Sequence, residues 1–108
     1  MYANGKTNIV FYTTEKYDIT GKKELIFTVT DMYYTNSASN GVWHFGIGNV
    51  QTDTNFVAEV SVNTKVDATK TEYKVQLPPD GGLYYIKIAC IRSSYYADSA
   101  LVSEIKMV

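Results

Sequence analysis

Residues 71–92 read TEYKVQLPPDGGLYYIKIACIR, and this stretch decides the fold class of the chain. Apolar and polar side chains alternate over 71–77, and β-branched and aromatic residues fill 83–92, so both segments are predicted to be strands. Between them lies Pro-Pro-Asp-Gly-Gly (78–82). Because proline has no N–H to donate to a strand ladder, this segment is predicted to be a turn. Strand, turn and strand in direct succession indicate antiparallel β structure.

The same patterns recur outward from this stretch, while no segment sustains the apolar spacing of a helix over three turns. Further strands are predicted at 8–13, 24–31, 42–48, 55–62 and 100–108, with a short extended piece at 17–20. Seven to eight short strands in a chain of 108 residues predict one all-β module over 1–108, built as an antiparallel two-sheet β-sandwich.

Alternation also assigns one face of each strand to the core, since a slip of one residue would turn Glu59, Lys74 and Lys87 inward. Trp43 is expected in the core and not on a binding platform, and the single cysteine is expected to be a buried structural thiol. The predicted core comprises Leu25, Phe27, Val29, Trp43, Phe45, Ile47, Phe56, Ala58, Val60, Val62, Tyr73, Val75, Leu77, Ile86, Ile88, Cys90, Ile105 and Met107.

Composition and motifs argue against several classes of function. The formal charge is −1, and the charged residues are scattered along the chain, so no basic patch for nucleic acid is expected. No apolar run approaches the roughly 20 residues that span a bilayer. His44 is the only imidazole, and no nucleophile elbow, Cys-x-x-Cys or phosphate-binding glycine loop is present. We therefore expect no enzyme activity, no cofactor and no metal site. The start, MYANGKTN, suggests a domain excised from a longer protein.

Two tyrosine doublets lie in stretches predicted to be loops. Tyr33-Tyr34 belongs to DMYYTNSASNG (31–41), and Tyr95-Tyr96 belongs to RSSYYADSA (92–100). If consecutive strands alternate in direction, every second connection lies at the same end of the sandwich. Both doublets are therefore predicted at one pole, with the connection 63–70 between them.

These two stretches have the composition of a sugar-binding site. An aromatic ring can stack on the apolar face of a pyranose, while polar side chains bind its hydroxyls. The candidate ligand-binding residues are Tyr33, Tyr34, Asn36, Asn40, Arg92, Tyr95, Tyr96 and Asp98. Two alternatives stay open: the tyrosines lie as lids over the ends of the core, or they form a protein interface.

Short motifs resemble the jelly-roll carbohydrate-binding modules found on secreted bacterial enzymes and on phage tail or receptor-binding proteins. YDITGKKEL (17–25) followed by IFTV (26–29) resembles their "Asp-aliphatic-Thr-Gly, then Leu-x-Phe" entry, and LYYIKI (83–88) with ALVSEIKM (100–107) resembles their last two strands. The resemblance implies a jelly-roll-like sandwich and an extracellular or virion location.

The sequence thus leads to two hypotheses about function. The first is a non-catalytic module that recognises cell-surface or polysaccharide glycans through its tyrosine-bearing pole. The second is a structural or assembly domain without a ligand, contacting further copies of itself, as in a trimer, or neighbouring domains of its parent protein.

Overall fold

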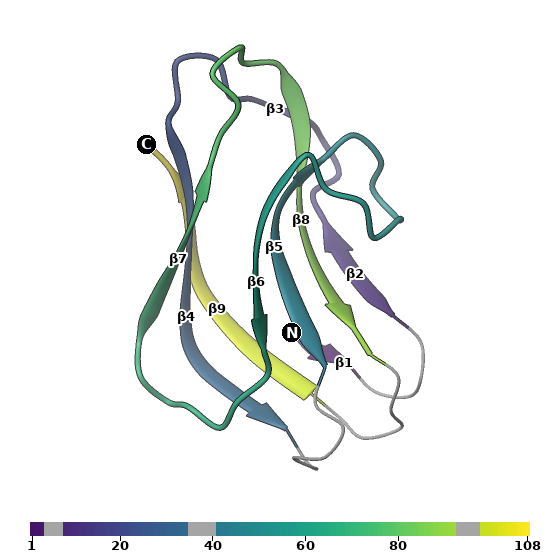
Figure 1. The fold of residues 1–108 in the computed structure, drawn as a ribbon, viewed down its shortest axis with the longest axis vertical. Coiled ribbons are helices and arrows are strands. Elements are labelled where there is room, and N and C mark those ends of the chain that lie inside the picture. Colours follow the sequence, from purple (N-terminus) through teal and green to yellow (C-terminus); the bar gives the residue numbers. More distant parts are fainter. Residues whose placement is uncertain (4–7, 35–40, 93–97) are drawn as a thin grey trace.

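The computed structural model describes residues 1–3, 8–34, 41–92 and 98–108, and it is built from β-strands (Figure 1). In chain order the strands are β1 (Tyr2–Ala3), β2 (Ile9–Tyr12), β3 (Tyr17–Asp18), β4 (Glu24–Tyr34), β5 (Val42–Gly48), β6 (Ala58–Asn63), β7 (Thr71–Gln76), β8 (Leu83–Ile91) and β9 (Asp98–Met107). The predicted strand at 42–48 has the observed bounds of β5, and the other predicted strands match an observed one with shifted ends.

The strands form two sheets that face each other in a sandwich. One sheet has the order β1-β9-β4-β7 and the other β2-β8-β5-β6, with β3 also pairing with β8, and every pairing is antiparallel. Apart from β3, the strands pair from the two ends of the chain inward: β1 with β9, β2 with β8, β4 with β7 and β5 with β6. This is the strand order of a jelly roll. The predicted β-sandwich is confirmed.

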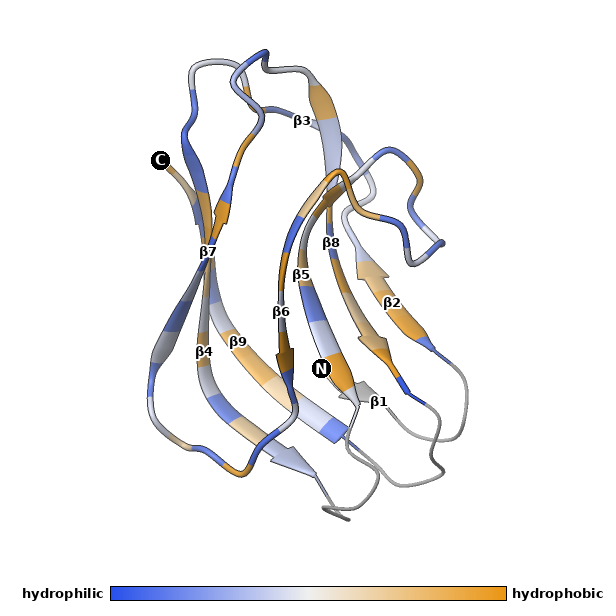
Figure 2. Ribbon diagram, in the orientation of Figure 1, coloured by the Kyte–Doolittle hydropathy of each residue, from blue (hydrophilic) through white to orange (hydrophobic). Residues whose placement is uncertain are grey.

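The core lies where the inward faces of the two sheets meet. Phe45 on β5 is fully buried, and its ring centroid lies 5.3 Å from that of Phe27 on β4 and 5.3 Å from that of Tyr73 on β7. Trp43 and Cys90 are also fully buried, so both were assigned correctly to the core. Hydrophobic and hydrophilic residues alternate along β6, as the period of two requires, while β2 is mostly hydrophobic (Figure 2).

One residue on its predicted outward face is buried, and the core assignment of two others was wrong. Lys87 lies on the outward face of β8 but is completely buried, because the segment 49–57 folds over it. Phe56 belongs to that segment and stacks on His44, outside the core. Ile105 points inward, opposite Phe27 in the strand register, yet it is 40% exposed. The alternation of apolar and polar residues within a strand does not show whether a segment distant in the sequence covers that strand.

The prediction that Tyr33 and Tyr34 lie in a loop was also wrong. Both belong to β4, where Tyr33 pairs with Ser99 and Tyr34 with Asp98. The first strand residue of β9 is Asp98, two positions earlier than predicted, and this pairing keeps β4 extended through the doublet. The tyrosines therefore sit on a sheet and not on a free connection.

Candidate functional site

The candidate site is the pole of the sandwich where β4 and β8 end and where β5 and β9 begin (Figure 1). The backbone of Met32 on β4 exchanges hydrogen bonds of 2.8 and 2.9 Å with that of Asp67, and the Thr64 N–H donates to the Gly41 carbonyl at 2.9 Å. The connection between β6 and β7 thus lies beside the end of β4 and the start of β5. The predicted position of 63–70 beside the first tyrosine stretch is confirmed for the strand ends that flank that stretch.

A buried ion pair holds this pole together from beneath. Arg92 Nη1, after β8, lies 3.0 Å from Asp98 Oδ2, at the start of β9, and the two side chains are 0% and 1% exposed. The contact has the distance of an ion pair but lacks the alignment of a hydrogen bond at Asp98 Oδ2. Asp98 Oδ1 accepts a 3.1 Å bond from the Gly41 N–H, and the Arg92 N–H donates to Asn8 Oδ1 at 3.0 Å. Four chain segments are therefore tied to one polar cluster.

Gly41 is the residue that lets these segments approach so closely. A Cβ atom at this position would lie 2.8 Å from Cys90 Sγ and 3.2 Å from Asp98 Oδ2. The Gly41 carbonyl accepts a second hydrogen bond, from Thr64 Oγ1, at 3.1 Å. A side chain here would push the start of β5 away from the ion pair.

Cys90 borders this cluster and has no reactive character. Burial, reinforced by the nearby Asp98 carboxylate, raises the pKa of its thiol to about 12. A thiol that stays protonated at neutral pH is a poor nucleophile and metal ligand. This agrees with the structural role expected from its place in a strand.

The structure places the predicted ligand-binding residues at two depths. Tyr33 is 51% exposed on the outward face of β4, while Tyr34 points to the inward side and is half-buried. Arg92 and Asp98 lie beneath the surface, where they join strand ends and do not present their charged groups to solvent. The remaining predicted positions, Asn36, Asn40, Tyr95 and Tyr96, lie outside the described residues.

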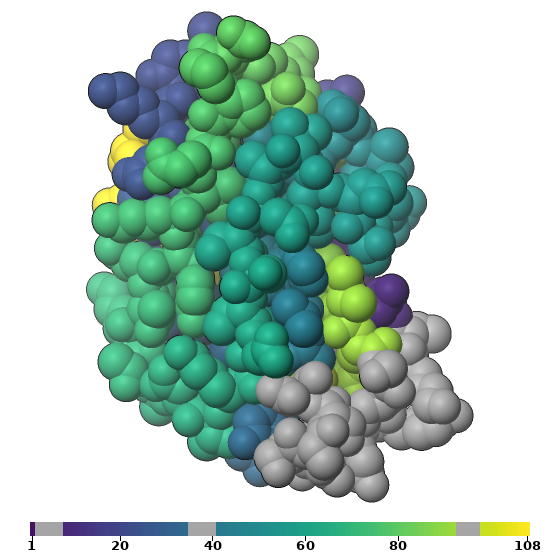
Figure 3. Space-filling view, in the orientation of Figure 1, coloured from purple at the N-terminus to yellow at the C-terminus, as the bar shows by residue number. Residues whose placement is uncertain are grey.

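A second polar cluster, on the outward face of the sheet β2-β8-β5-β6, was missed by the sequence reasoning. Lys87 Nζ lies 2.8 Å from both Asp53 Oδ1 and the Asn55 carbonyl oxygen, and 4.9 Å from the centre of the Phe56 ring. Gln51 Nε2 donates to the Thr13 carbonyl at 3.1 Å. The segment 49–57, the teal connection at the upper right of Figures 1 and 3, is thus fastened across this face.

One sequence signal could have indicated this cluster. Lys87 is paired in register with Gly46, and Gly48 follows on the same face of β5. A Cβ on Gly48 would lie 2.8 Å from Lys87 Cδ, so the glycine leaves room for the lysine stem. Two glycines on a strand beside a central lysine indicate that something packs closely there. The contacts of Lys87 therefore anchor the segment 49–57. Beside Asp53 and Phe56 lies a hollow of about 240 Å³ that is open to solvent.

We expect the anchor of segment 49–57 to weaken in acid. The hydrogen bond from Lys87 holds the pKa of Asp53 below its usual range, so the carboxylate stabilises the fold above its unfolded pKa, and this contribution is lost as pH falls through the folded pKa. Lys87→Met should remove the anchor at every pH. Amide hydrogen exchange should then become several-fold faster at Asn55 and Val57, and this rise should be smaller at low pH, where wild type has already lost the contact.

The control variant for this experiment changes a lysine on the other sheet, β1-β9-β4-β7. Lys74→Met changes an exposed lysine on β7, for which the structure shows no ion pair among the described residues. It should leave exchange in 49–57 unchanged. Equal exchange in Lys87→Met and wild type at neutral pH would contradict the anchoring role.

The described residues show neither a metal site nor a membrane-spanning helix. Within the described ranges, no three His, Cys, Asp or Glu side chains lie close enough together to hold a metal ion. No helix in that part of the chain is long and apolar enough to cross a membrane. Comparison with models of protein families, with curated proteins and with solved structures finds no match.

Proposed function

We propose that this domain is a non-catalytic glycan-binding module that engages its ligand at the pole formed by the ends of β4 and β8. Stacking of Tyr33 on the apolar face of a sugar ring supplies the main contact, and polar groups of the adjoining connections bind the hydroxyls. The domain serves a protein that acts at a cell surface, either a secreted bacterial protein or a phage tail protein. Its role there is attachment.

The observation that carries the proposal is an exposed aromatic ring on a rigid base. Tyr33 is 51% exposed although its backbone pairs with Ser99 of β9, so the backbone is fixed while the ring stays accessible. Beneath the same pole, the ion pair of Arg92 and Asp98 fixes the strand ends. A strand backbone fixed before binding loses little conformational entropy when the ring stacks, which favours recognition by a shallow site.

The jelly-roll strand order gives further support, because the strand ends that flank both tyrosine-containing stretches lie at the same end of the sandwich. The sequence also predicts Tyr95 and Tyr96 as ligand-binding residues, and these two rings would extend the stacking surface of Tyr33. Shallow sites of this kind bind weakly, so several copies acting together are needed for firm attachment.

The test is a glycan array probed with the domain displayed in many copies. Tyr33→Ala should lower retention on the glycans that wild type binds by at least about tenfold, the effect of losing one central aromatic contact. The thermal midpoint should change little, because the ring is half exposed.

Tyr17→Ala is the matched control. Tyr17 is 48% exposed and pairs with Tyr84 on β8, at the end of the sandwich away from the proposed site. It should bind as wild type does. No binding by folded, multivalent wild-type protein, or equal loss in both variants, would count against the proposal.

A further inference from the structure

The edge of β9 is only partly covered by a neighbouring strand. β4 pairs with β9 from Asp98 to Met107, but on the other side β1 reaches only Asp98 and Ser99. Met1 extends this contact by one position, since its amino group donates to the Ala100 carbonyl at 2.8 Å and its own carbonyl accepts from the Ala100 N–H at 3.0 Å. From Leu101 onward, no described strand pairs with this side of β9. Such an edge offers free N–H and C=O groups to a further strand.

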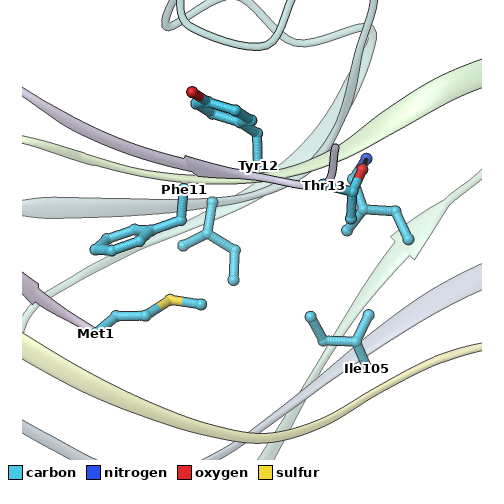
Figure 4. Close-up of a pocket in the computed structure, with 7 residues that line it drawn as sticks. Met1, Phe11, Tyr12, Thr13 and Ile105 are labelled. Carbon is cyan, nitrogen blue, oxygen red and sulfur yellow. Dashed lines mark hydrogen bonds between the residues drawn. The ribbon is translucent and has the colours of Figure 1, made fainter. Parts of the chain in front are cut away.

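An apolar crevice opens directly below this free edge. Phe11 on β2 and Ile86 and Ile88 on β8 form one wall, Ile105 on β9 forms the other, and Met1 closes one end (Figure 4). Its volume is about 150 Å³. Ile105 is 40% exposed although it points between the sheets, because no strand beyond β9 covers it. The sandwich is therefore incomplete at this edge.

The free edge is complementary to itself. When two copies of one strand pair antiparallel about a two-fold axis at Ile105, each Glu104 lies opposite the partner's Lys106, and each Lys106 opposite the partner's Glu104. Both side chains are exposed on the outward face, across from Thr28 and Ile26 of β4. Neither forms an ion pair within the described part of its own chain. In this register the two Ile105 side chains meet on the inward side.

We propose that β9 pairs with β9 of a second copy of this chain, about a two-fold axis at Ile105, to form a dimer with a continuous sheet across both sandwiches. The strand ladder supplies backbone hydrogen bonds, the two crevices join into one apolar space, and the Glu104 and Lys106 pairs select the register. β1 limits the contact to the residues beyond Ala100. Because the shared edge is short, the dimer forms at high micromolar concentration.

Exchange of charge tests the register directly. Lys106→Glu places four carboxylates along the contact, and Glu104→Lys places four ammonium groups there, so each variant alone should dimerise at least about tenfold more weakly than wild type. Mixing the two variants restores both opposite-charge pairs and should restore dimers. The double variant Glu104→Lys/Lys106→Glu should dimerise as wild type does. Sedimentation equilibrium over the micromolar to millimolar range measures the mass, which should approach twice 12.1 kDa in wild type.

The controls separate a loss of pairing from a loss of folding. Both residues are exposed, so at low micromolar concentration, where every protein is monomeric, the far-ultraviolet circular dichroism and the thermal midpoint of each variant should match those of wild type. Lys74→Glu, on the outward face of β7, is the matched charge reversal and should leave dimerisation unchanged. Wild type that remains at 12.1 kDa throughout would overturn the proposal, and so would single variants that dimerise as strongly as wild type.

Discussion

Replacing Asp98 with alanine should destabilise the domain by about 3–5 kcal/mol, because it removes the carboxylate that lies 3.0 Å from the buried guanidinium of Arg92. The two side chains are 0% and 1% exposed, so the pair is shielded from solvent in the folded state. The Gly41 N–H also loses its 3.1 Å acceptor. Urea unfolding at neutral pH measures the free energy, and Asp31→Ala, at an exposed position on β4, should change it by less than about 0.5 kcal/mol.

A double replacement distinguishes a buried charge from lost packing. Arg92→Met together with Asp98→Leu removes both charges and should be markedly more stable than Asp98→Ala alone, since well-packed apolar pairs commonly substitute for buried ion pairs. A double variant as unstable as the single one would show that other contacts of these side chains dominate. A small loss in Asp98→Ala itself would contradict the role given to the pair.

Phe45→Ala should cost about 3–5 kcal/mol, the usual range for deleting a buried phenylalanine ring. Phe45 is fully buried on β5, and its ring bridges the sheets through Phe27 and Tyr73, each 5.3 Å away between centroids. The resulting void lies between two sheets held apart by their other side chains, so it cannot close. Thermal and urea unfolding should both show the loss.

Two variants calibrate this result. Phe45→Leu keeps part of the apolar volume and should lose less than half as much free energy as the alanine variant. Val66→Ala, at a side chain that is 62% exposed, should stay within about 0.5 kcal/mol of wild type. Equal losses for Phe45→Ala and Val66→Ala would mean that the contact between sheets contributes little at this point.

The fold could be predicted because the alternation of apolar and polar residues within a strand shows which of its faces points inward. On β5, Trp43, Phe45 and Ile47 alternate with polar or small residues, and a period of two allows only one buried face. The turn at 78–82 likewise follows from proline and glycine alone. These features depend on neighbours in the sequence, which is the information that a single chain supplies.

The errors arose where one segment covers another that is distant in the sequence. Nothing near Lys87 in the chain shows that Asp53 and Asn55 will close over it, so alternation predicted its outward face but not its burial. The pole is a similar case. Arg92 and Asp98 look like surface residues of a polar stretch, and only the meeting of β5, β8 and β9 buries them. Tyr33 was recognised as an exposed ring, but its place on β4 depends on the pairing with Ser99.

The buried cluster of Arg92, Asp98 and Gly41 also bears on how freely this protein can vary and be engineered. Because these buried contacts fix the strand ends, an exposed side chain at the same pole, such as that of Tyr33, need not contribute to stability. Selection can then change such exposed positions while the fold is retained, and a library randomised there should yield many folded members. A domain of this architecture would serve as a small, disulfide-free display scaffold.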